Sequence, residues 1–159
     1  MRVFAFIGLV PAVLAADRAE AKEETKPWVI TDDIHGVISF PTVFEIIAED
    51  PIFDRLKQVG QLGPVRWIVA SASHNRYEHS IGVAHLAMKL VDNLLHTRAF
   101  TMQHLIVGLA GLLHDVGHVA FSHLYEDVVA AHGKEKLASQ EFDEEKASMY
   151  TGFKHEYAS

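Results

Sequence analysis

The sequence predicts a mainly α-helical fold with a short β-hairpin near the N-terminus, and three observations carry that prediction. From residue 41 onward, apolar residues recur at spacings of three and four, which is typical of helices that bury one face. Residues 28–40 alternate apolar and polar side chains around a His-Gly pair, as a hairpin does. The chain has 159 residues and is 49% hydrophobic, so it can form one domain with its own core.

The predicted helices begin and end at residues with known capping or breaking chemistry. Pro41 can start the first helix, and the Asp-Pro pair at residues 50–51 breaks it. A helix of about twenty residues follows from Arg76, because its apolar residues form one face. Thr101 suits the N-cap of the next helix, which ends at the sequence HDVGH. These boundaries place HDVGH at the end of a strongly apolar helix.

The C-terminal part of the chain predicts one further helix and a charged segment. Ser122 can cap a helix, and Gly133 is expected to end it. Residues 134–146 are rich in charge and are interpreted as a solvated segment. We find neither internal repeats nor low-complexity sequence.

The N-terminus divides into two short segments before the domain proper. Residues 1–16 form an apolar run opened by Arg2 and closed by small residues, which resembles a secretory signal peptide and is too short for a membrane span. A buried element or a misassigned gene start is the alternative interpretation. Residues 17–27 are a charged linker, and residues 28–159 are assigned to one domain.

Composition narrows the choice of partners and metal ligands. The net charge of -7 argues against nucleic acid as the main partner, although it allows a local basic pocket for a small polyanion. The chain has no cysteine, so any metal must be held by its 11 histidines and its carboxylates. Imidazole and carboxylate together suit a divalent metal ion.

His79, His114 and Asp115 are the candidate metal ligands. Asp115 ends an apolar helix, where burial and the helix dipole both disfavour an anion, and a bound cation would offset both penalties. A single histidine is more often a hydrogen-bonded structural residue than a ligand. Five other histidines are therefore interpreted as capping, surface or packing residues: His74, His85, His96, His104 and His132.

Three segments together resemble a known family. SHNRYEHSIGVAHLA, GLAGLLHDVGHVAFSHLYE and KHEYAS are similar in order and spacing to the HD-domain deoxynucleoside triphosphate triphosphohydrolases, above all to the animal SAM-and-HD-domain dNTPases. The likeness runs from about residue 29 to residue 159. It implies an HD/PDEase-like helix bundle, and it also makes His79, His114 and Asp115 metal ligands.

The resemblance implies catalytic roles for four further residues. His118 would contact the reacting phosphate, and His123 would act as general acid toward the 5′-oxygen of the leaving group. Glu126 stands where the family has an aspartate that orients this histidine, so the carboxylate is kept on a longer side chain. His155, in KHEYAS, matches an active-site histidine near the phosphates.

The substrate-binding residues that the resemblance implies are Gln61, Arg76, His118 and His155. Gln61 matches a residue that reads the sugar hydroxyl, and Arg76 matches an arginine that contacts phosphate. The implied reaction is metal-dependent hydrolysis of a dNTP, dGTP for example, to deoxynucleoside and inorganic triphosphate. The implied metal is a divalent ion such as Mg²⁺, Mn²⁺, Fe²⁺ or Zn²⁺.

The family also implies a homo-oligomer in the nucleus or cytoplasm, whereas a true signal peptide would imply secretion. The family's metal set includes a further aspartate, which normally follows the KHEYAS-like segment and has no match in this sequence. Two alternatives therefore stay open. One is a non-catalytic HD module that binds a nucleotide or a protein partner. The other is a different HD-type phosphohydrolase or phosphodiesterase.

Overall fold

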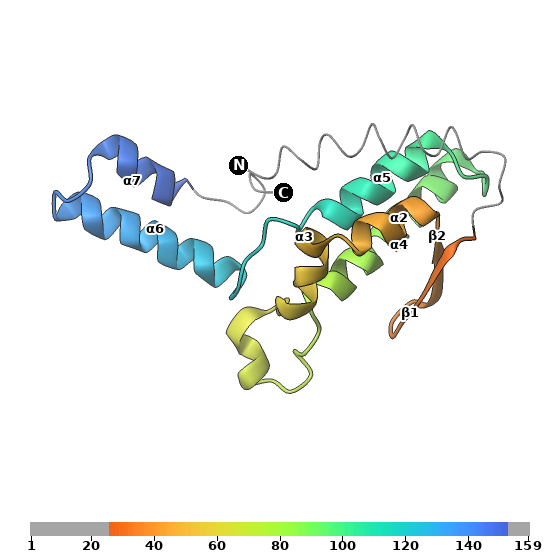
Figure 1. Ribbon diagram of the computed structural model, residues 1–159, viewed down its shortest axis with the longest axis horizontal. Helices are drawn as coiled ribbons and strands as arrows, with labels where there is room; N and C mark the ends of the chain where they lie inside the picture. The colour runs from red at the N-terminus through yellow and green to blue at the C-terminus, as the bar shows by residue number, and fades with distance from the viewer. Residues whose placement is uncertain (1–25, 153–159) are drawn as a thin grey trace. The chain divides into compact units, whose positions relative to one another are not determined.

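The computed structural model of the protein describes residues 26–152. Within that range the chain forms two compact units, one from residues 26–54 and 82–111 and the other from residues 55–81 and 112–152. The described elements are six α-helices, α2 to α7, two 3-10 helices and one two-stranded sheet, which confirms the mainly α-helical prediction (Figure 1). The predicted signal segment, residues 1–16, lies outside the described residues.

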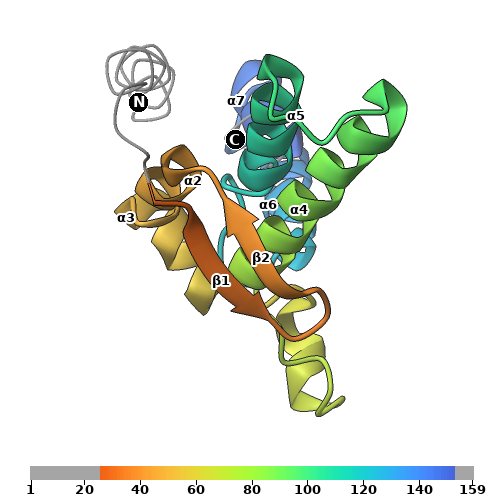
Figure 2. The ribbon, with the colours of Figure 1, turned by 90° about the vertical axis from the view of Figure 1, so that its right-hand side faces the viewer.

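The predicted hairpin is confirmed at the start of the first unit. Strand β1 (Trp28–Asp32) pairs antiparallel with β2 (Gly36–Phe40) (Figure 2). In this register Trp28 lies opposite Phe40. The Asp32 carboxylate closes the turn by accepting hydrogen bonds from the backbone N–H groups of Ile34 and His35, at 2.9 and 2.7 Å. This local bonding of an aspartate to the next residues is a common turn-forming device.

Aromatic packing and a close helix contact build the core of the first unit. Helix α2 (Thr42–Ala48) ends just before the Asp-Pro pair, as predicted, and α3 (Pro51–Asp54) follows it. The rings of Phe40 and Phe44 stack with centroids 5.0 Å apart. A Cβ on Gly108 would lie 2.8 Å from Phe44 Cζ, so the glycine allows helix α5 (Met102–Leu113) to approach this ring closely.

Two helices position the candidate metal ligands. Helix α4 (Arg76–Leu95) has the predicted start and a length of 20 residues. Helix α5 (Met102–Leu113) ends immediately before His114, and a run of turns at residues 114–117 follows. The first turns of α4 and the chain after α5 both belong to the second unit.

A looped segment of the second unit leads into α4. It contains the 3-10 helices η1 (Arg55–Gln58) and η2 (Gly63–Trp67). A β-bridge joins Gly60 to Asn75, and the Arg76 N–H donates to the Val59 carbonyl at 2.9 Å. These backbone contacts fix the residues around position 60 beside the start of α4.

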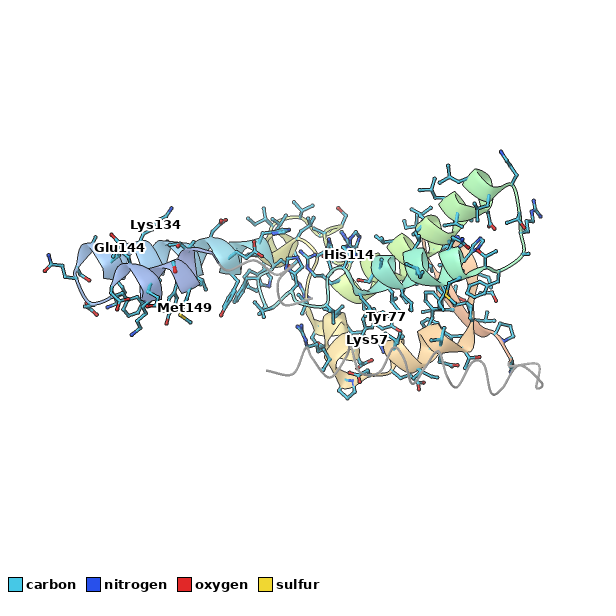
Figure 3. The ribbon with its side chains drawn as sticks, turned by 90° about the horizontal axis from the view of Figure 1, so that it is seen from above. Lys57, Tyr77, His114, Lys134, Glu144 and Met149 are labelled. Carbon is cyan, nitrogen blue, oxygen red and sulfur yellow. The ribbon has the colours of Figure 1, made fainter. Side chains whose placement is uncertain are left out.

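Helices α6 (His123–Ala138) and α7 (Glu144–Thr151) form a helical hairpin in the second unit (Figures 1 and 3). The prediction that Gly133 ends α6 is wrong, because the helix continues for five more residues. A Cβ at Gly133 would lie 2.6 Å from Tyr150 Cβ, so this glycine serves close packing of α7 rather than helix termination. The charged residues 134–146 are mostly exposed, as expected.

No helix among residues 26–152 is both long enough and apolar enough to cross a membrane.

Candidate metal centre

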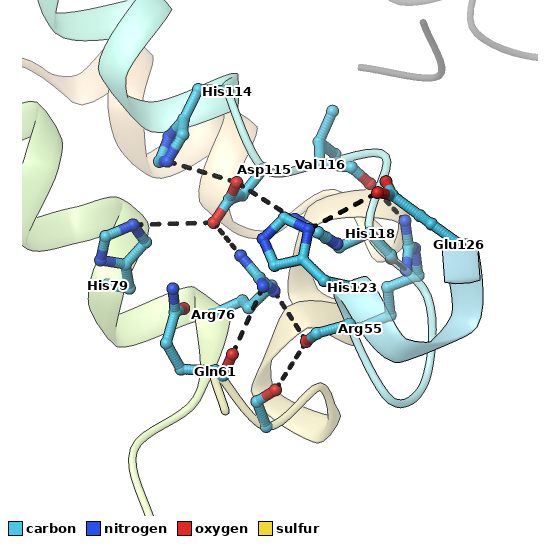
Figure 4. A network of polar contacts seen from close by, with 12 residues as sticks. Arg55, Gln61, Arg76, His79, His114, Asp115, Val116, His118, His123 and Glu126 are labelled. Carbon is cyan, nitrogen blue, oxygen red and sulfur yellow. Dashed lines mark hydrogen bonds and ion pairs between the residues drawn. The ribbon is translucent and has the colours of Figure 1, made fainter. Parts of the chain in front are cut away.

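The structure brings His79, His114 and Asp115 together in the second unit (Figure 4). One potential ligand atom from each residue lies within 4.8 Å of the others. His79 Nε2 is 3.6 Å from one Asp115 carboxylate oxygen, and His114 Nε2 is 3.3 Å from the other. The two imidazole rings have centroids 5.2 Å apart. Residues on α4 and after α5 thus form one group that could hold a metal ion.

Arg76 is the buried counterion of this group. Its side chain is 2% exposed, and its guanidinium donates a hydrogen bond to the Asp115 carboxylate. It also donates to the Ser122 hydroxyl at 3.1 Å and to the Gln61 carbonyl at 3.3 Å. Because a buried carboxylate is costly without a partner, this pair explains how the fold tolerates Asp115 after an apolar helix.

The electrostatics favour the metal-binding forms of Asp115 and His79 by shifting the pKa of each. Burial alone would raise the pKa of Asp115, but the nearby charges of His114 and Arg76 outweigh it and hold that pKa below its ordinary value. Burial lowers the pKa of His79, against the opposing pull of Asp115. Both shifts favour an ionised carboxylate and a neutral imidazole near neutral pH, which are the forms that bind metals.

His118 and His123 lie beside each other next to the group. His118 is 1% exposed and has its Nε2 atom 3.6 Å from the Asp115 carboxylate. Its ring is perpendicular to that of His123, with centroids 4.8 Å apart. His123 is 65% exposed, and its Nδ1 atom lies 3.6 Å from the carboxylate of the buried Glu126. Of these two neighbouring rings, that of His118 is therefore buried beside Asp115 and that of His123 is open to solvent.

Ser122 has a different role from the predicted one. It stands at the N-cap position of α6, but its side chain makes no capping hydrogen bond. Instead its hydroxyl donates to the Gly60 carbonyl at 2.8 Å and accepts from Arg76. The prediction of a Ser122 cap is therefore wrong. The hydroxyl joins the start of α6 to the loop that precedes α4.

Gln61 and His155 are two further residues that the sequence predicted to bind substrate. The Gln61 backbone is held at both ends, since its N–H donates to the His74 carbonyl at 3.1 Å and its carbonyl accepts from Arg76. Its side-chain oxygen is buried and has no hydrogen-bond partner among residues 26–152. His155 lies outside the described residues.

Arg55 is a residue of this region that the sequence did not single out. Its guanidinium donates to the backbone carbonyls of Val116 and His118, more than sixty positions along the chain. No local pattern in the sequence indicates this contact, because its partners are backbone atoms of a distant turn.

The HD domain family matches residues 76–155 of the chain. This match covers half of the sequence, and its described part contains Arg76, the three candidate metal ligands, His118, His123 and Glu126. The protein therefore belongs to the HD domain family.

Curated relatives share the same region. The chain is 42% identical over 102 residues to the deoxynucleoside triphosphate triphosphohydrolase SAMHD1 of Bos taurus and 44% identical over 103 residues to that of Xenopus laevis. It is 38% identical over 112 residues to the SAMHD1 homolog of Dictyostelium discoideum. The alignments include 62%, 62% and 68% of this chain but only 17%, 16% and 22% of the relatives' own lengths. The recognition of an HD-domain, dNTPase-like sequence is thereby confirmed.

Proposed function

We propose that the protein is an HD-type phosphohydrolase that hydrolyses deoxynucleoside triphosphates to deoxynucleoside and inorganic triphosphate. The observation that carries the proposal is the convergence of His79, His114 and Asp115 ligand atoms within 4.8 Å. The relatives named as deoxynucleoside triphosphate triphosphohydrolases support the choice of substrate class.

The donor set fits a divalent metal ion held by His79, His114 and Asp115. Two imidazole nitrogens and one carboxylate oxygen suit Mn²⁺, Fe²⁺ or Zn²⁺ better than Mg²⁺, which prefers oxygen ligands alone. When bound, such an ion neutralises phosphate charge and lowers the pKa of a coordinated water. We assign these three residues to the metal.

Arg76 and Gln61 are assigned to substrate binding. The Arg76 guanidinium pairs with the same carboxylate that the His79 ring approaches, so its donor groups lie next to the proposed metal ion and the phosphates that this ion would bind. The buried Gln61 side-chain oxygen is an unused acceptor among the described residues, which suits a sugar hydroxyl. His155 is assigned to the phosphates by family resemblance.

His118, His123 and Glu126 are assigned to proton transfer and phosphate contact. Water attacks the α-phosphorus, the bond from phosphorus to the 5′-oxygen breaks, and the leaving oxygen takes a proton from His123. The Glu126 carboxylate, 3.6 Å from His123 Nδ1, orients the imidazole for this transfer. General acid catalysis of this kind contributes roughly 10²–10⁴-fold to a rate. His118, buried beside Asp115, would contact the reacting phosphate.

We also propose that residues 28–159 belong to one HD phosphohydrolase domain, larger than the matched segment. Gln61 and Ser122 both contact Arg76, so the loop before the match contributes to the same site.

The direct test is product analysis after incubation of the purified chain with dGTP and Mn²⁺. We expect deoxyguanosine and inorganic triphosphate in equal amounts, detected by ³¹P NMR and chromatography. The His114→Ala variant should lose the activity. The matched control is His96→Asn, because His96 is exposed in the first unit and asparagine tolerates its positive φ of 49°. This control should retain the wild-type rate.

Two outcomes would overturn the proposal. Metal binding without any turnover would indicate a non-catalytic HD module. Release of pyrophosphate or monophosphate, or cleavage only of a phosphodiester substrate, would indicate another HD-type phosphohydrolase or phosphodiesterase.

A further inference from the structure

The turn that follows α5 carries both Asp115 and His118 within a stretch of four consecutive residues. Two backbone hydrogen bonds shape it, from the Val116 N–H to the Leu113 carbonyl and from the His118 N–H to the Asp115 carbonyl, both at 3.0 Å. These bonds use the carbonyls of Leu113 and Asp115. The carbonyls of Val116 and His118 point elsewhere, and both receive a hydrogen bond from Arg55 (Figure 4).

The Arg55 guanidinium bridges these two carbonyls with separate nitrogens. Nη1 donates to the His118 carbonyl and Nη2 donates to the Val116 carbonyl. The fork therefore fixes the distance across Gly117, which is itself buried. One of these two carbonyls belongs to Val116, the residue directly after Asp115, and the other belongs to His118 itself. The position of Arg55 thus sets the backbone from which both side chains project.

Only an arginine can make this contact as observed. Its planar fork presents two parallel donors, whereas a lysine ammonium is a point charge that cannot span two carbonyls in fixed geometry. Burial lowers the pKa of Arg55, but a guanidinium remains charged at any physiological pH. Loss of the fork would leave two carbonyls of a largely buried turn without their donor.

We propose that Arg55 is a positioning residue that holds Asp115 and His118 in the geometry needed to bind metal and phosphate. This inference rests on the proposed function, because it assigns Arg55 to the same site. The Arg55 guanidinium reaches the site through hydrogen bonds to the backbone of the turn, at the carbonyls of Val116 and His118. Residues that hold metal ligands in place commonly change metal affinity by roughly 10–100-fold when they are removed.

The test compares Arg55→Gln, Arg55→Lys and the control Arg66→Gln. Arg66 is an exposed arginine of η2 in the same unit, and its substitution removes the same charge away from the turn. Co²⁺ affinity is measured by visible absorption. We expect Arg55→Gln to bind Co²⁺ roughly 10–100-fold more weakly, Arg55→Lys to restore only part of the affinity, and Arg66→Gln to match the wild type.

Two further measurements separate positioning from a general loss of folding. Millimolar guanidinium added to Arg55→Ala should restore Co²⁺ affinity, whereas the same concentration of sodium chloride should not. In the metal-free protein, the imidazole NMR signals of His118 should shift in Arg55→Gln and stay unchanged in Arg66→Gln.

The inference is overturned if Arg55→Gln keeps both the wild-type Co²⁺ affinity and the wild-type His118 signals. A wild-type chain that binds no Co²⁺ would instead contradict the proposed metal site. In that case the His118 signals alone decide the role of Arg55, so the two failures are distinguishable.

Discussion

Each compact unit contains a buried histidine beside a carboxylate, and the two arrangements differ in their geometry. In the first unit, His104 is 3% exposed, with Nε2 3.0 Å from the Asp92 carboxylate and Nδ1 2.7 Å from the Thr101 hydroxyl. The Thr101 N–H also donates to the same Nδ1 atom, at 3.1 Å. Both ring nitrogens are thus used at ordinary hydrogen-bond lengths. His104 therefore links Thr101, at the start of α5, to Asp92 on α4.

The carboxylate of the second unit has an excess of basic neighbours. Asp115 pairs with Arg76 and has the nitrogens of His79, His114 and His118 at 3.3–3.6 Å. These histidine contacts are longer than ordinary hydrogen bonds. The comparison shows what separates a structural pair from a candidate binding site. The first is closed by hydrogen bonds of ordinary length, whereas the second gathers three histidine rings at 3.3–3.6 Å from one carboxylate.

The largest expected difference between the units is the effect of neutralising each carboxylate. Asp115→Asn leaves the Arg76 charge buried without its counterion, so we expect a loss of about 3–5 kcal/mol in the free energy of unfolding. Asp92→Asn should cost only about 1 kcal/mol, because the Asp92 side chain is 39% exposed. Urea denaturation in the presence of a chelator measures both values. Equal losses would contradict the distinction.

A smaller difference is expected at two glycines with positive φ. Gly36, in the first unit, has φ +73°, and a Cβ added there would have no atom within 4 Å, so Gly36→Ala should cost about 1 kcal/mol for backbone strain. Gly63, in the second unit, has φ +53°, and its Cβ would lie 2.9 Å from the Phe121 carbonyl oxygen. Gly63→Ala should cost about 2–4 kcal/mol, since overpacking adds to the strain.

Thermal and urea unfolding of the two alanine variants provide the comparison. A Gly63→Ala variant no less stable than Gly36→Ala would show that the Phe121 contact relaxes at little cost.

The smallest expected effect is the acid sensitivity contributed by His85 in the first unit. Burial and the charge of Lys89 lower its pKa, against the opposing effect of Asp32. The folded-state pKa therefore lies below the unfolded value of 6.5, so the contribution of His85 is complete above pH 6.5 and is lost as the pH falls through the folded pKa. Replacing His85 with glutamine should reduce the stability lost between pH 7 and pH 5, measured by urea unfolding. An unchanged loss would contradict this assignment.

The sequence predicted those features that depend on local periodicity or on a shared motif. The hairpin of residues 28–40 and the long helix from Arg76 follow from side-chain spacing, and the structure confirms both. The proximity of His79 and Asp115 was predicted from the segments that resemble a known family, because no local sequence pattern links residues on separate elements.

The features that the sequence did not predict depend on long-range contacts. Gly133 lies within α6, where the absence of a side chain allows Tyr150 to pack close to the helix. Ser122 makes no capping hydrogen bond, because its hydroxyl donates to the Gly60 carbonyl and accepts from Arg76. Arg55 binds carbonyls, which any sequence offers at every position. Packing between distant segments decides each of these cases.

A Co²⁺ titration of the wild-type chain and three single-histidine variants tests the proposed metal centre most directly. We expect His79→Ala and His114→Ala to weaken Co²⁺ binding by more than about 100-fold, since each removes a proposed ligand. His104→Asn, which alters the closed pair of the first unit, should bind Co²⁺ like the wild type. If all three variants bind the ion with the wild-type affinity, the metal centre is not formed by His79, His114 and Asp115.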